Sequence, residues 1–269
     1  MLRIMISCLK RAALVVGALA CLFTAPAQAA HPNALWRVVH GLCLRDMRLR
    51  GRPAPCLAVD LSQGVAVVPD LERATQVLLV PTTRLPGIES PLLLRDGRPN
   101  YWQAAWEARW FVQRRAGRPL PRDLVAMAIN SARSRSQNQL HIHVDCVRPE
   151  VRAALNAREA QIGPAWRNLP IVLRDQVWKV RKLRGGELGR RDPFRLLAGG
   201  DPAARRGMGL YALAVVGATF SDGSPGFYLL STSRGQAFGE VLLDHRCAVL
   251  QPGGSPPAKK GLPSPRLAP

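Results

Sequence analysis

The sequence contains few acidic residues, few aromatic residues and none of the short motifs that mark zinc sites. Asp and Glu number 18 against 38 Lys and Arg, and aromatic residues make up 6% of the chain. No Cys-x-x-Cys or His-Glu-x-x-His occurs, and a structural zinc site needs four ligands. No recognition motif or series of stacking aromatics accompanies the net charge of +20, which disfavours nucleic acid as a partner. An anionic membrane surface or an anionic substrate fits this charge better, and a compositional bias towards arginine is the alternative explanation.

The first 29 residues have the pattern of a signal peptide. A basic stretch precedes an apolar run over 12–23, and Ala27-Gln28-Ala29 is an A-x-A cleavage site. An uncleaved N-terminal membrane anchor is the alternative, because the apolar run is near the lower length limit for a membrane span. A lipoprotein signal at Cys21 is disfavoured, because the usual leucine three residues earlier is absent. Each alternative predicts an exported protein at the periplasmic face of the inner membrane.

Four cysteines follow the leader, namely Cys43, Cys56, Cys146 and Cys247. An even number in an exported chain predicts two disulfides, with three possible pairings. We favour Cys43–Cys56, which would close a short loop with little core of its own. The second disulfide would then be Cys146–Cys247, which would link the histidine-containing strand over 139–146 to the C-terminal part of the chain. A catalytic cysteine is the weaker hypothesis.

An alternating stretch over 139–146, Gln-Leu-His-Ile-His-Val-Asp-Cys, predicts a β-strand with one apolar and one polar face. His141 and His143 lie on the polar face, about 7 Å apart, and a polar, basic loop over 130–138 precedes them. This combination suits phosphoryl chemistry, because imidazole can act as a nucleophile near neutral pH. Serine, asparagine and arginine side chains can hold phosphate oxygens. A metal site and a solvated strand without function are the alternatives.

Other segments predict an α+β fold, in which strands and helices follow one another along the chain. Strands are expected over 65–68, 75–80, 124–129, 177–183, 211–216 and 227–231. Helices are expected over 35–42, 101–116 and 148–161, with a short one from 192. The strand over 124–129 should pair antiparallel with the histidine strand, since the polar loop joins their ends.

The helix over 101–116 has a clear start and a distinctive face. Asn100 is expected to cap it, with Gln103 completing a capping box. Tryptophans recur every four residues at 102, 106 and 110, which places them on one face. Packing against the sheet is favoured over cytosine stacking or lipid contact.

An ordered set of motifs carries a family resemblance. The motifs are Val80-Pro81-Thr82-Thr83-Arg84, Gly87-Ile88-Glu89-Ser90-Pro91, Ala128-Ile129-Asn130-Ser131, Gln137-Asn138, His141-Ile142-His143 and Asp244-His245-Arg246-Cys247. From about Trp36 to Leu250 the chain resembles the CDP-diacylglycerol pyrophosphatase family. The histidine strand also resembles the His-φ-His-φ-His-φ strand of the HIT superfamily, where φ is apolar, with Gln139 replacing the first histidine.

The resemblance implies a HIT-like antiparallel sheet with flanking helices over residues 30–250. It also implies hydrolysis of CDP-diacylglycerol to CMP and phosphatidate through a nucleotidyl-histidine intermediate. His141 corresponds to the nucleophile and His143 to a histidine that lines the phosphate site. Neither a metal nor a cofactor is required by this scheme.

Five further residues are candidates for substrate binding. By resemblance, Asn130 and Ser136 contact phosphate, and Gln139 takes over part of the orienting role of the missing histidine. Arg84 lies in a loop that could face the substrate. His245 belongs to a shared motif and would approach the histidine strand if Cys146 bonds Cys247.

Relatives in the superfamily often pair two domains, as dimers or as an internal duplication. The second half of this chain is therefore a candidate for a degenerate HIT-like partner, and a homodimer is the other expectation. Residues 251–269 are rich in Pro, Gly and Lys and predict a disordered tail. Two other functions remain open: a broader nucleotide-pyrophosphate hydrolase or nucleotidyl transferase, and a non-enzymatic exported module that binds acidic lipid.

Overall fold

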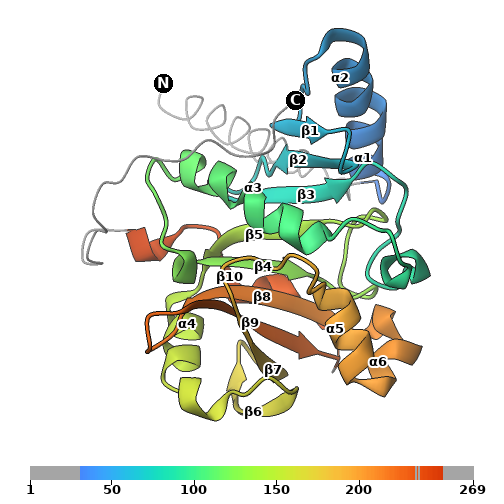
Figure 1. Ribbon diagram of the computed structural model, residues 1–269. Helices are drawn as coiled ribbons and strands as arrows, with labels where there is room; N and C mark the ends of the chain where they lie inside the picture. The colour runs from blue at the N-terminus through green and yellow to red at the C-terminus, as the bar shows by residue number, and fades with distance from the viewer. Residues whose placement is uncertain (1–30, 234, 236, 251–269) are drawn as a thin grey trace, which may run out of the picture. The chain divides into compact units, whose positions relative to one another are not determined.

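The computed structural model describes residues 31–233, 235 and 237–250 (Figure 1). The predicted signal peptide and the predicted tail after residue 250 lie outside these residues. Pro32–Pro269 forms one compact unit, whose described part combines helices with a ten-stranded sheet. All strand pairings in that sheet are antiparallel, so the predicted α+β class is confirmed. Within the described ranges, no helix combines the length and the apolar character that crossing a membrane requires.

Nine strands of the sheet lie in the order β1-β2-β3-β5-β4-β8-β9-β7-β6, and β10 pairs with β5 outside this order. Their bounds are β1 (Ala58–Asp60), β2 (Val65–Pro69), β3 (Val77–Pro81), β4 (Val125–Ile129), β5 (Ile142–Val147), β6 (Arg167–Leu173), β7 (Gln176–Arg184), β8 (Ala212–Thr219), β9 (Pro225–Thr232) and β10 (Leu243–Asp244). The seven predicted strands are confirmed, including the histidine strand as β5 and its antiparallel pairing with β4. Three strands were missed, and two of them, β1 and β10, are too short for alternation to show.

The helices are α1 (Ala34–Trp36), α2 (Leu44–Arg50), α3 (Tyr101–Arg115), α4 (Pro149–Asn156), α5 (Pro193–Gly200) and α6 (Pro202–Arg206). A π-helical segment, η1 (Arg37–Cys43), joins α1 to α2. The shorter 3-10 segments are η2 (Pro91–Leu94), η3 (Arg122–Leu124), η4 (Glu159–Gln161), η5 (Met208–Leu210), η6 (Gly239–Leu242) and η7 (Ala248–Leu250). The helix predicted over 35–42 therefore continues to Arg50.

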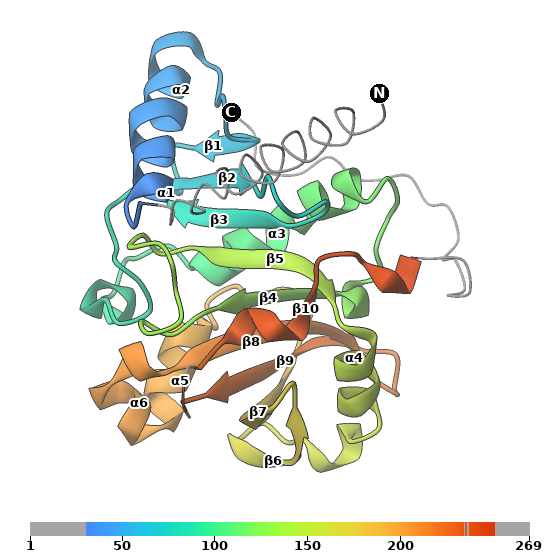
Figure 2. The ribbon, with the colours of Figure 1, turned by 180° about the vertical axis from the view of Figure 1, so that it is seen from behind.

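Different elements cover the two faces of the sheet (Figures 1 and 2). On the first face, α3 and α5 pack with alternate residues of the strands, such as Val144, in the largest apolar cluster. On the second face, α4 packs on β4, β8 and β9, and the N-terminal helix packs on β2 and β3. Between these two clusters β5 places His143 and Asp145 instead of apolar residues. The pleat of one strand thus supplies both a core and a polar site.

The start of α3 confirms one sequence prediction and corrects another. The Asn100 side chain accepts hydrogen bonds from the backbone N–H groups of Trp102 and Gln103, so Asn100 is the N-cap. The capping box is wrong, because the Gln103 amide binds Glu107 and Glu187 instead of the Asn100 backbone. Trp102 is fully buried, as predicted for a helix face that packs in the core.

Both predicted disulfides are present. Cys43 bonds Cys56 with a Cα–Cα distance of 5.6 Å, and Cys146 bonds Cys247 with a Cα–Cα distance of 5.3 Å. The Cys146 side chain lies in the first-face core, away from the histidines.

The two halves of the sheet repeat one topology. In the first half, β3 leads through α3 to β4, and β5 returns to lie between β4 and β3. In the second half, β7 leads through α5 and α6 to β8, and β9 returns to lie between β8 and β7. The halves meet at the antiparallel β4–β8 pair. This repetition supports the predicted internal duplication, and β9 carries no histidine or carboxylate, as a degenerate half would.

Candidate active site

The two histidines lie close together on the second face. His141 directly precedes β5, and His143 lies within it, opposite Leu78 of β3 and Ala128 of β4. Their rings are 4.8 Å apart at an interplanar angle of 70°, and each residue is 7% exposed.

A backbone contact fixes the tautomer of His141. Its Nδ1 lies 2.7 Å from the carbonyl oxygen of Gln139, and a carbonyl only accepts, so Nδ1 carries the proton. The lone pair is therefore on Nε2. Burial lowers the pKa of His141, the Gln139 carbonyl opposes this effect, and the nearby Arg135 charge adds to it. A neutral ring with a free Nε2 lone pair is the form that a nucleophile requires.

His143 has the opposite tautomer. Its Nδ1 lies 2.9 Å from Nε2 of Gln76. The same Gln76 nitrogen is 3.0 Å from a carboxylate oxygen of Asp70, so it must be the donating end of the amide. Nδ1 of His143 consequently accepts, and Nε2 carries the proton. This Nε2 is buried and has no partner among the described residues.

His143 is held neutral more strongly than His141. Burial lowers its pKa well below the ordinary histidine value, and the charges of His141, His245 and Arg73 act in the same direction. Its Nε2–H is thus a neutral, unsatisfied donor next to the His141 ring, and such a donor suits a phosphate oxygen.

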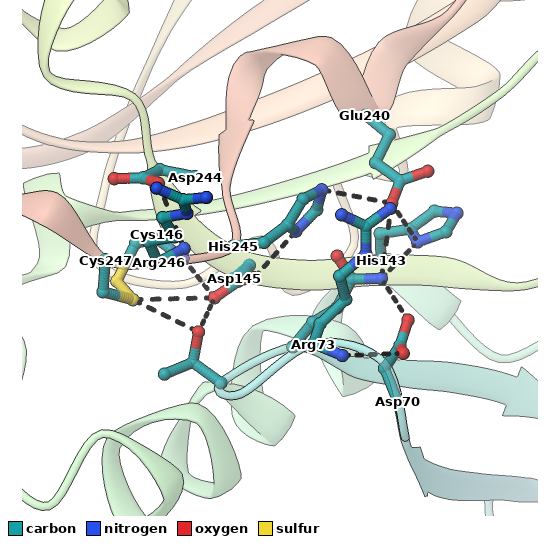
Figure 3. A network of polar contacts seen from close by, with 12 residues as sticks. Asp70, Arg73, His143, Asp145, Cys146, Glu240, Asp244, His245, Arg246 and Cys247 are labelled. Atoms are coloured by element: carbon teal, nitrogen blue, oxygen red, sulfur yellow. Dashed lines mark hydrogen bonds and ion pairs between the residues drawn. A yellow bond between two sulfur atoms is a disulfide. The ribbon is translucent and has the colours of Figure 1, made fainter. Parts of the chain in front are cut away.

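A third histidine, His245, lies between two carboxylates (Figure 3). Its Nδ1 is 3.0 Å from Oδ2 of Asp145, and its Nε2 is 3.3 Å from Oε1 of Glu240. The pairing of β10 with β5 explains this position, because the residue after Asp244 falls opposite Asp145.

Asp145 is fully buried behind His245. Its Oδ1 accepts hydrogen bonds from the hydroxyl of Thr75 at 2.6 Å and from the backbone N–H of Cys146 at 2.9 Å. Burial raises the pKa of Asp145, whereas the hydrogen bonds from His245, Thr75 and Cys146 lower it. These bonds fix the direction of the carboxylate towards His245.

Glu240 comes from η6, which approaches the sheet closely at Gly239, its first residue. A Cβ atom on Gly239 would lie 2.7 Å from the carbonyl oxygen of Ile129, so only glycine allows this approach. Asn130 accepts from the Glu240 backbone N–H at 3.1 Å and donates to Oε2 at 3.4 Å. Oε1 then faces His245 and the Nδ1 atom of His143, at 3.3 and 3.5 Å.

Two arginines place positive charge next to the histidines. Arg135 pairs with Glu89 at 2.6 Å. Its positive charge also lowers the pKa of His141. A Cβ on Gly87 would lie 2.3 Å from its guanidinium, so the glycine makes room for it. Arg73 extends from the β2–β3 turn towards Glu240 and His143 (Figure 3).

A hollow of about 530 Å³ lies beside the polar loop and η6. Its lining residues are Arg133, Ser134, Arg135, Ser136, Gln176, Phe238 and Val241. Arg135 lines this hollow, and its charge also lowers the pKa of His141.

One group of described residues meets the simple geometric requirement of a metal site, namely Asp145, Cys146 and Cys247. Both cysteines are joined in a disulfide, so they offer no thiolate ligand. This group therefore stabilises the fold and leaves Asp145 free to bind His245.

Comparison with known proteins identifies the family. A model of the CDP-diacylglycerol pyrophosphatase family matches residues 30–251. The chain belongs to this family. A protein from Yersinia pestis named CDP-diacylglycerol pyrophosphatase is 38% identical over 223 residues, which cover 81% of this chain and 85% of the relative. Both names denote hydrolases that act on a pyrophosphate bond.

In this member of the CDP-diacylglycerol pyrophosphatase family, the candidate site residues occupy different places. The structure brings His141, His143, Asn130 and His245 together around Glu240. Ser136 is exposed and lines the hollow.

Gln139 and Arg84 have other contacts. The buried Gln139 amide donates to the carbonyl oxygens of Pro81 and Thr83, both at 2.9 Å, so only its backbone carbonyl orients His141. Arg84 is exposed, donates to Asn33 and stacks over Trp36 at 5.2 Å.

Sequence inspection missed Glu240, Gln76, Asp70 and Arg73 in this pyrophosphatase family member, whereas Arg135 belongs to the basic loop over 130–138 that the sequence analysis identified. Glu240 and Gln76 are separated by 164 positions along the chain, and no spacing rule connects such residues. Asp145 offered a signal, since it alternates with the two histidines on one strand face.

Proposed function

We propose that the protein hydrolyses CDP-diacylglycerol to CMP and phosphatidate, with Nε2 of His141 as the nucleophile. The observation that carries this proposal is the hydrogen bond from His141 Nδ1 to the Gln139 carbonyl, which leaves the Nε2 lone pair free in a buried, neutral ring. The name of the family and of its Yersinia pestis relative supports the substrate.

In the first step, His141 Nε2 attacks the phosphorus on the cytidine side. The N–P bond forms, the bond from that phosphorus to the bridging oxygen breaks, and phosphatidate leaves with the electron pair. Arg135 and the Nε2–H of His143 would stabilise charge on the phosphoryl oxygens. Ser136, Asn130 and Arg84 remain candidates for substrate contacts, the first as a lining residue of the hollow.

In the second step, water attacks the same phosphorus. The O–P bond forms, the N–P bond breaks, and the electron pair returns to Nε2 as CMP is released. The water loses one proton, for which the carboxylates of Glu240 and Asp145 are nearby acceptors through His245. Splitting one displacement into two lowers the barrier of each step.

The proposed compartment is the periplasmic face of the inner membrane. The two disulfides support an oxidising environment, and the pattern of residues 1–29 supports export. Protease added to intact spheroplasts should then digest the protein, whereas a cytoplasmic control protein should survive. Protection of both would contradict export.

The test of the proposed reaction is a product analysis. The purified protein is incubated with CDP-diacylglycerol, and CMP and phosphatidate are measured for the wild type, for His141→Ala and for His40→Ala. His40 is exposed and stacks on Trp36, so its variant is a matched histidine control. We expect CMP and phosphatidate from the wild type and His40→Ala, and a loss of at least about 1,000-fold in His141→Ala.

The same assay separates hydrolysis from transfer. An added alcohol or phosphate acceptor should leave CMP as the product if water is the acceptor. A cytidylylated acceptor would instead indicate a nucleotidyl transferase. Undiminished CMP release in His141→Ala would exclude this histidine as the nucleophile.

A further inference from the structure

The N-terminal helix exposes leucines next to unpaired arginines. Leu42 is 52% exposed, Leu49 is 71% exposed, and Leu57 and Leu61 nearby are 36% and 51% exposed. The helical residues Gly41, Leu42, Arg45, Asp46, Leu49 and Arg50 line a hollow of about 540 Å³ together with Ala54 and Pro55. We call Leu42, Leu49, Arg45 and Arg48 the leucine–arginine surface.

The segment that carries this surface has a strong excess of positive charge. Five arginines and one acid, Asp46, occur between residues 32 and 59. Asp46 binds Arg50 at 2.6 Å, whereas Arg45 and Arg48 have no ion pair within the described part of the chain. An apolar helix face flanked by free arginines is typical of helices that lie in the interface of an anionic membrane.

The exposed leucines are not needed for the core. The helix packs on β2 and β3 through its other side, with Val39, Cys43 and Leu44 buried. The Cys43–Cys56 disulfide fixes the loop after the helix against this packed side. The leucine–arginine surface is therefore held rigidly outward, at the edge of the sheet where β1 lies (Figure 2).

The beginning of the same helix contacts the loop that precedes His141. The backbone N–H of Leu35 donates to the Gln137 side chain at 2.9 Å. The backbone N–H of Asn138 donates to the Pro32 carbonyl at 2.6 Å. At about 1.5 Å per residue, Leu42 lies about 10 Å and Leu49 about 20 Å along the helix from Leu35, so the surface begins near the loop that precedes His141 and extends away from it.

We propose that the leucine–arginine surface docks on an anionic phospholipid bilayer and thereby presents lipid-embedded substrate to the site. Leu42 and Leu49 enter the boundary between headgroups and acyl chains, and Arg45 and Arg48 bind lipid phosphates. This inference rests on the proposed function, because it gives the site a substrate that lies in a membrane.

The test compares two physical forms of one substrate, using the full chain throughout. CDP-diacylglycerol with long acyl chains is embedded in vesicles of phosphatidylglycerol and phosphatidylcholine, and CDP-diacylglycerol with short acyl chains is kept monomeric in solution. The variants are Leu42→Ser/Leu49→Ser and Arg45→Ser/Arg48→Ser.

Matched controls lie elsewhere on the molecule. Val172→Ser removes an apolar side chain that is 61% exposed on β6, the strand at the opposite edge of the sheet. Arg205→Ser/Arg206→Ser removes two exposed arginines from the last turn of α6. Any segment before residue 31 is identical in all variants, so differences between them report on the substituted surface.

We expect both surface variants to keep the wild-type kcat/KM on the soluble substrate and to lose activity on vesicles. The loss should be about fivefold for each arginine and about tenfold or more for the leucine pair. The arginine effect should disappear on vesicles of phosphatidylcholine alone. Both controls should match the wild type on both substrates.

Equal vesicle activity in all variants would overturn the docking proposal, even if hydrolysis is confirmed. Lower sedimenting mass in the leucine variant, with unchanged vesicle activity, would assign the surface to a contact between two copies of the chain. If the wild type hydrolyses neither substrate, the proposed function fails. Cosedimentation of the same variants with vesicles still decides whether the surface binds membranes.

Discussion

His141 and His143 lie side by side in one buried pocket and yet present different atoms. Nδ1 of His141 donates to the Gln139 carbonyl, which leaves a lone pair on Nε2. Nδ1 of His143 accepts from the Gln76 amide, so the proton of that ring is on Nε2. One ring therefore offers a lone pair and the other an N–H group. Under the proposed mechanism the same residue type serves two roles, because Nδ1 has a different partner in each ring.

The pH dependence of the reaction follows from the lowered pKa of His141. Burial, reinforced by Arg135, keeps the ring neutral at pH values where an exposed histidine is protonated. We expect the acid limb of the kcat/KM profile, where activity falls with decreasing pH, to lie below pH 6.5, the ordinary histidine value. A profile measured between pH 4.5 and 8, with circular dichroism to show that the fold persists, checks this. An acid limb at or above pH 6.5 would contradict it.

Gln76 is a positioning residue in this account. Gln76→Met keeps the volume but removes the donor that fixes the His143 tautomer. We expect kcat to fall about 10–100-fold, the cost of one hydrogen bond of about 1–3 kcal/mol, with little change in KM. Gln113→Met, on α3, is the matched control. A change confined to KM would contradict the positioning role.

The site was partly predictable from single residues. The alternation over 139–146 placed both histidines and Asp145 on one face, because strand periodicity is a local property. The partners Glu240, Gln76 and Asp70 come from other strands and turns, and their convergence depends on the order of strands in the sheet. Gln139 illustrates a second reason why the sequence could not predict the whole site. It contacts His141 through its backbone carbonyl, and a backbone contact cannot be predicted from the identity of the side chain.

At the scale of elements, strong local signals predicted helices and strands well. Asn100 marked the start of α3, short apolar runs marked strands such as β2 and β4, and alternation marked β5. Short strands such as β1 and β10 were not predicted, because two or three residues are too few to show an alternation of apolar and polar side chains. The π-helical turn of η1 is also invisible in the sequence, where its residues resemble an ordinary helix.

The N-cap of α5 gives a test of stability at this scale. Asp192 is buried and accepts from the Phe194 backbone N–H at 2.8 Å, and burial raises its pKa from 3.8 to about 6. The folded state therefore binds a proton more tightly than the unfolded state, and stability falls as pH rises from about 4 to about 6. Asp192→Asn keeps the capping acceptor and cannot ionise.

We expect Asp192→Asn to stabilise the protein at pH 7.5 by up to about 3 kcal/mol and to have little effect at pH 4. Denaturant unfolding at both pH values measures this. Asp201, the N-cap of α6, is the contrasting control: burial raises its pKa, but hydrogen bonds from Lys179 and from backbone amides lower it overall. Asp201→Asn should therefore destabilise at pH 7.5. A destabilising Asp192→Asn would contradict the prediction.

At the scale of the whole molecule, two disulfides close loops of very different length. Cys146–Cys247 spans 101 positions and Cys43–Cys56 spans 13. The longer bond also holds His245 near Asp145, since Cys247 is two residues further along the chain. The sequence suggested both pairs, because each ties together segments that otherwise share little core.

Removing the longer disulfide should cost more than removing the shorter one. Chain-entropy arguments give about 4.7 kcal/mol for a loop of this length and about 3 kcal/mol for the shorter loop. Cys146→Ala/Cys247→Ala should also lower kcat, whereas Cys43→Ala/Cys56→Ala should leave the soluble-substrate kcat close to wild type. Unfolding curves and kinetics of both variants check this. Equal kcat in the two variants would contradict the role of the bond in holding His245.

The repeated topology of the sheet implies one site per chain. The first half carries the histidines on β5, and β9, its counterpart in the second half, carries none. A degenerate second half was suggested by family resemblance and not by sequence similarity between the halves, and the repeated strand order is consistent with it. A covalent intermediate should therefore reach at most one equivalent per chain.

That intermediate is the most direct test of the central claim. CDP-diacylglycerol labelled on the cytidine-side phosphate is mixed with the protein, quenched with base within the first turnover, and the protein is digested for mass spectrometry. The account predicts CMP attached to the peptide that contains His141, labile to acid, at no more than one per chain, and absent from His141→Ala. Rapid turnover without any attached CMP, or CMP on another residue, would contradict the account.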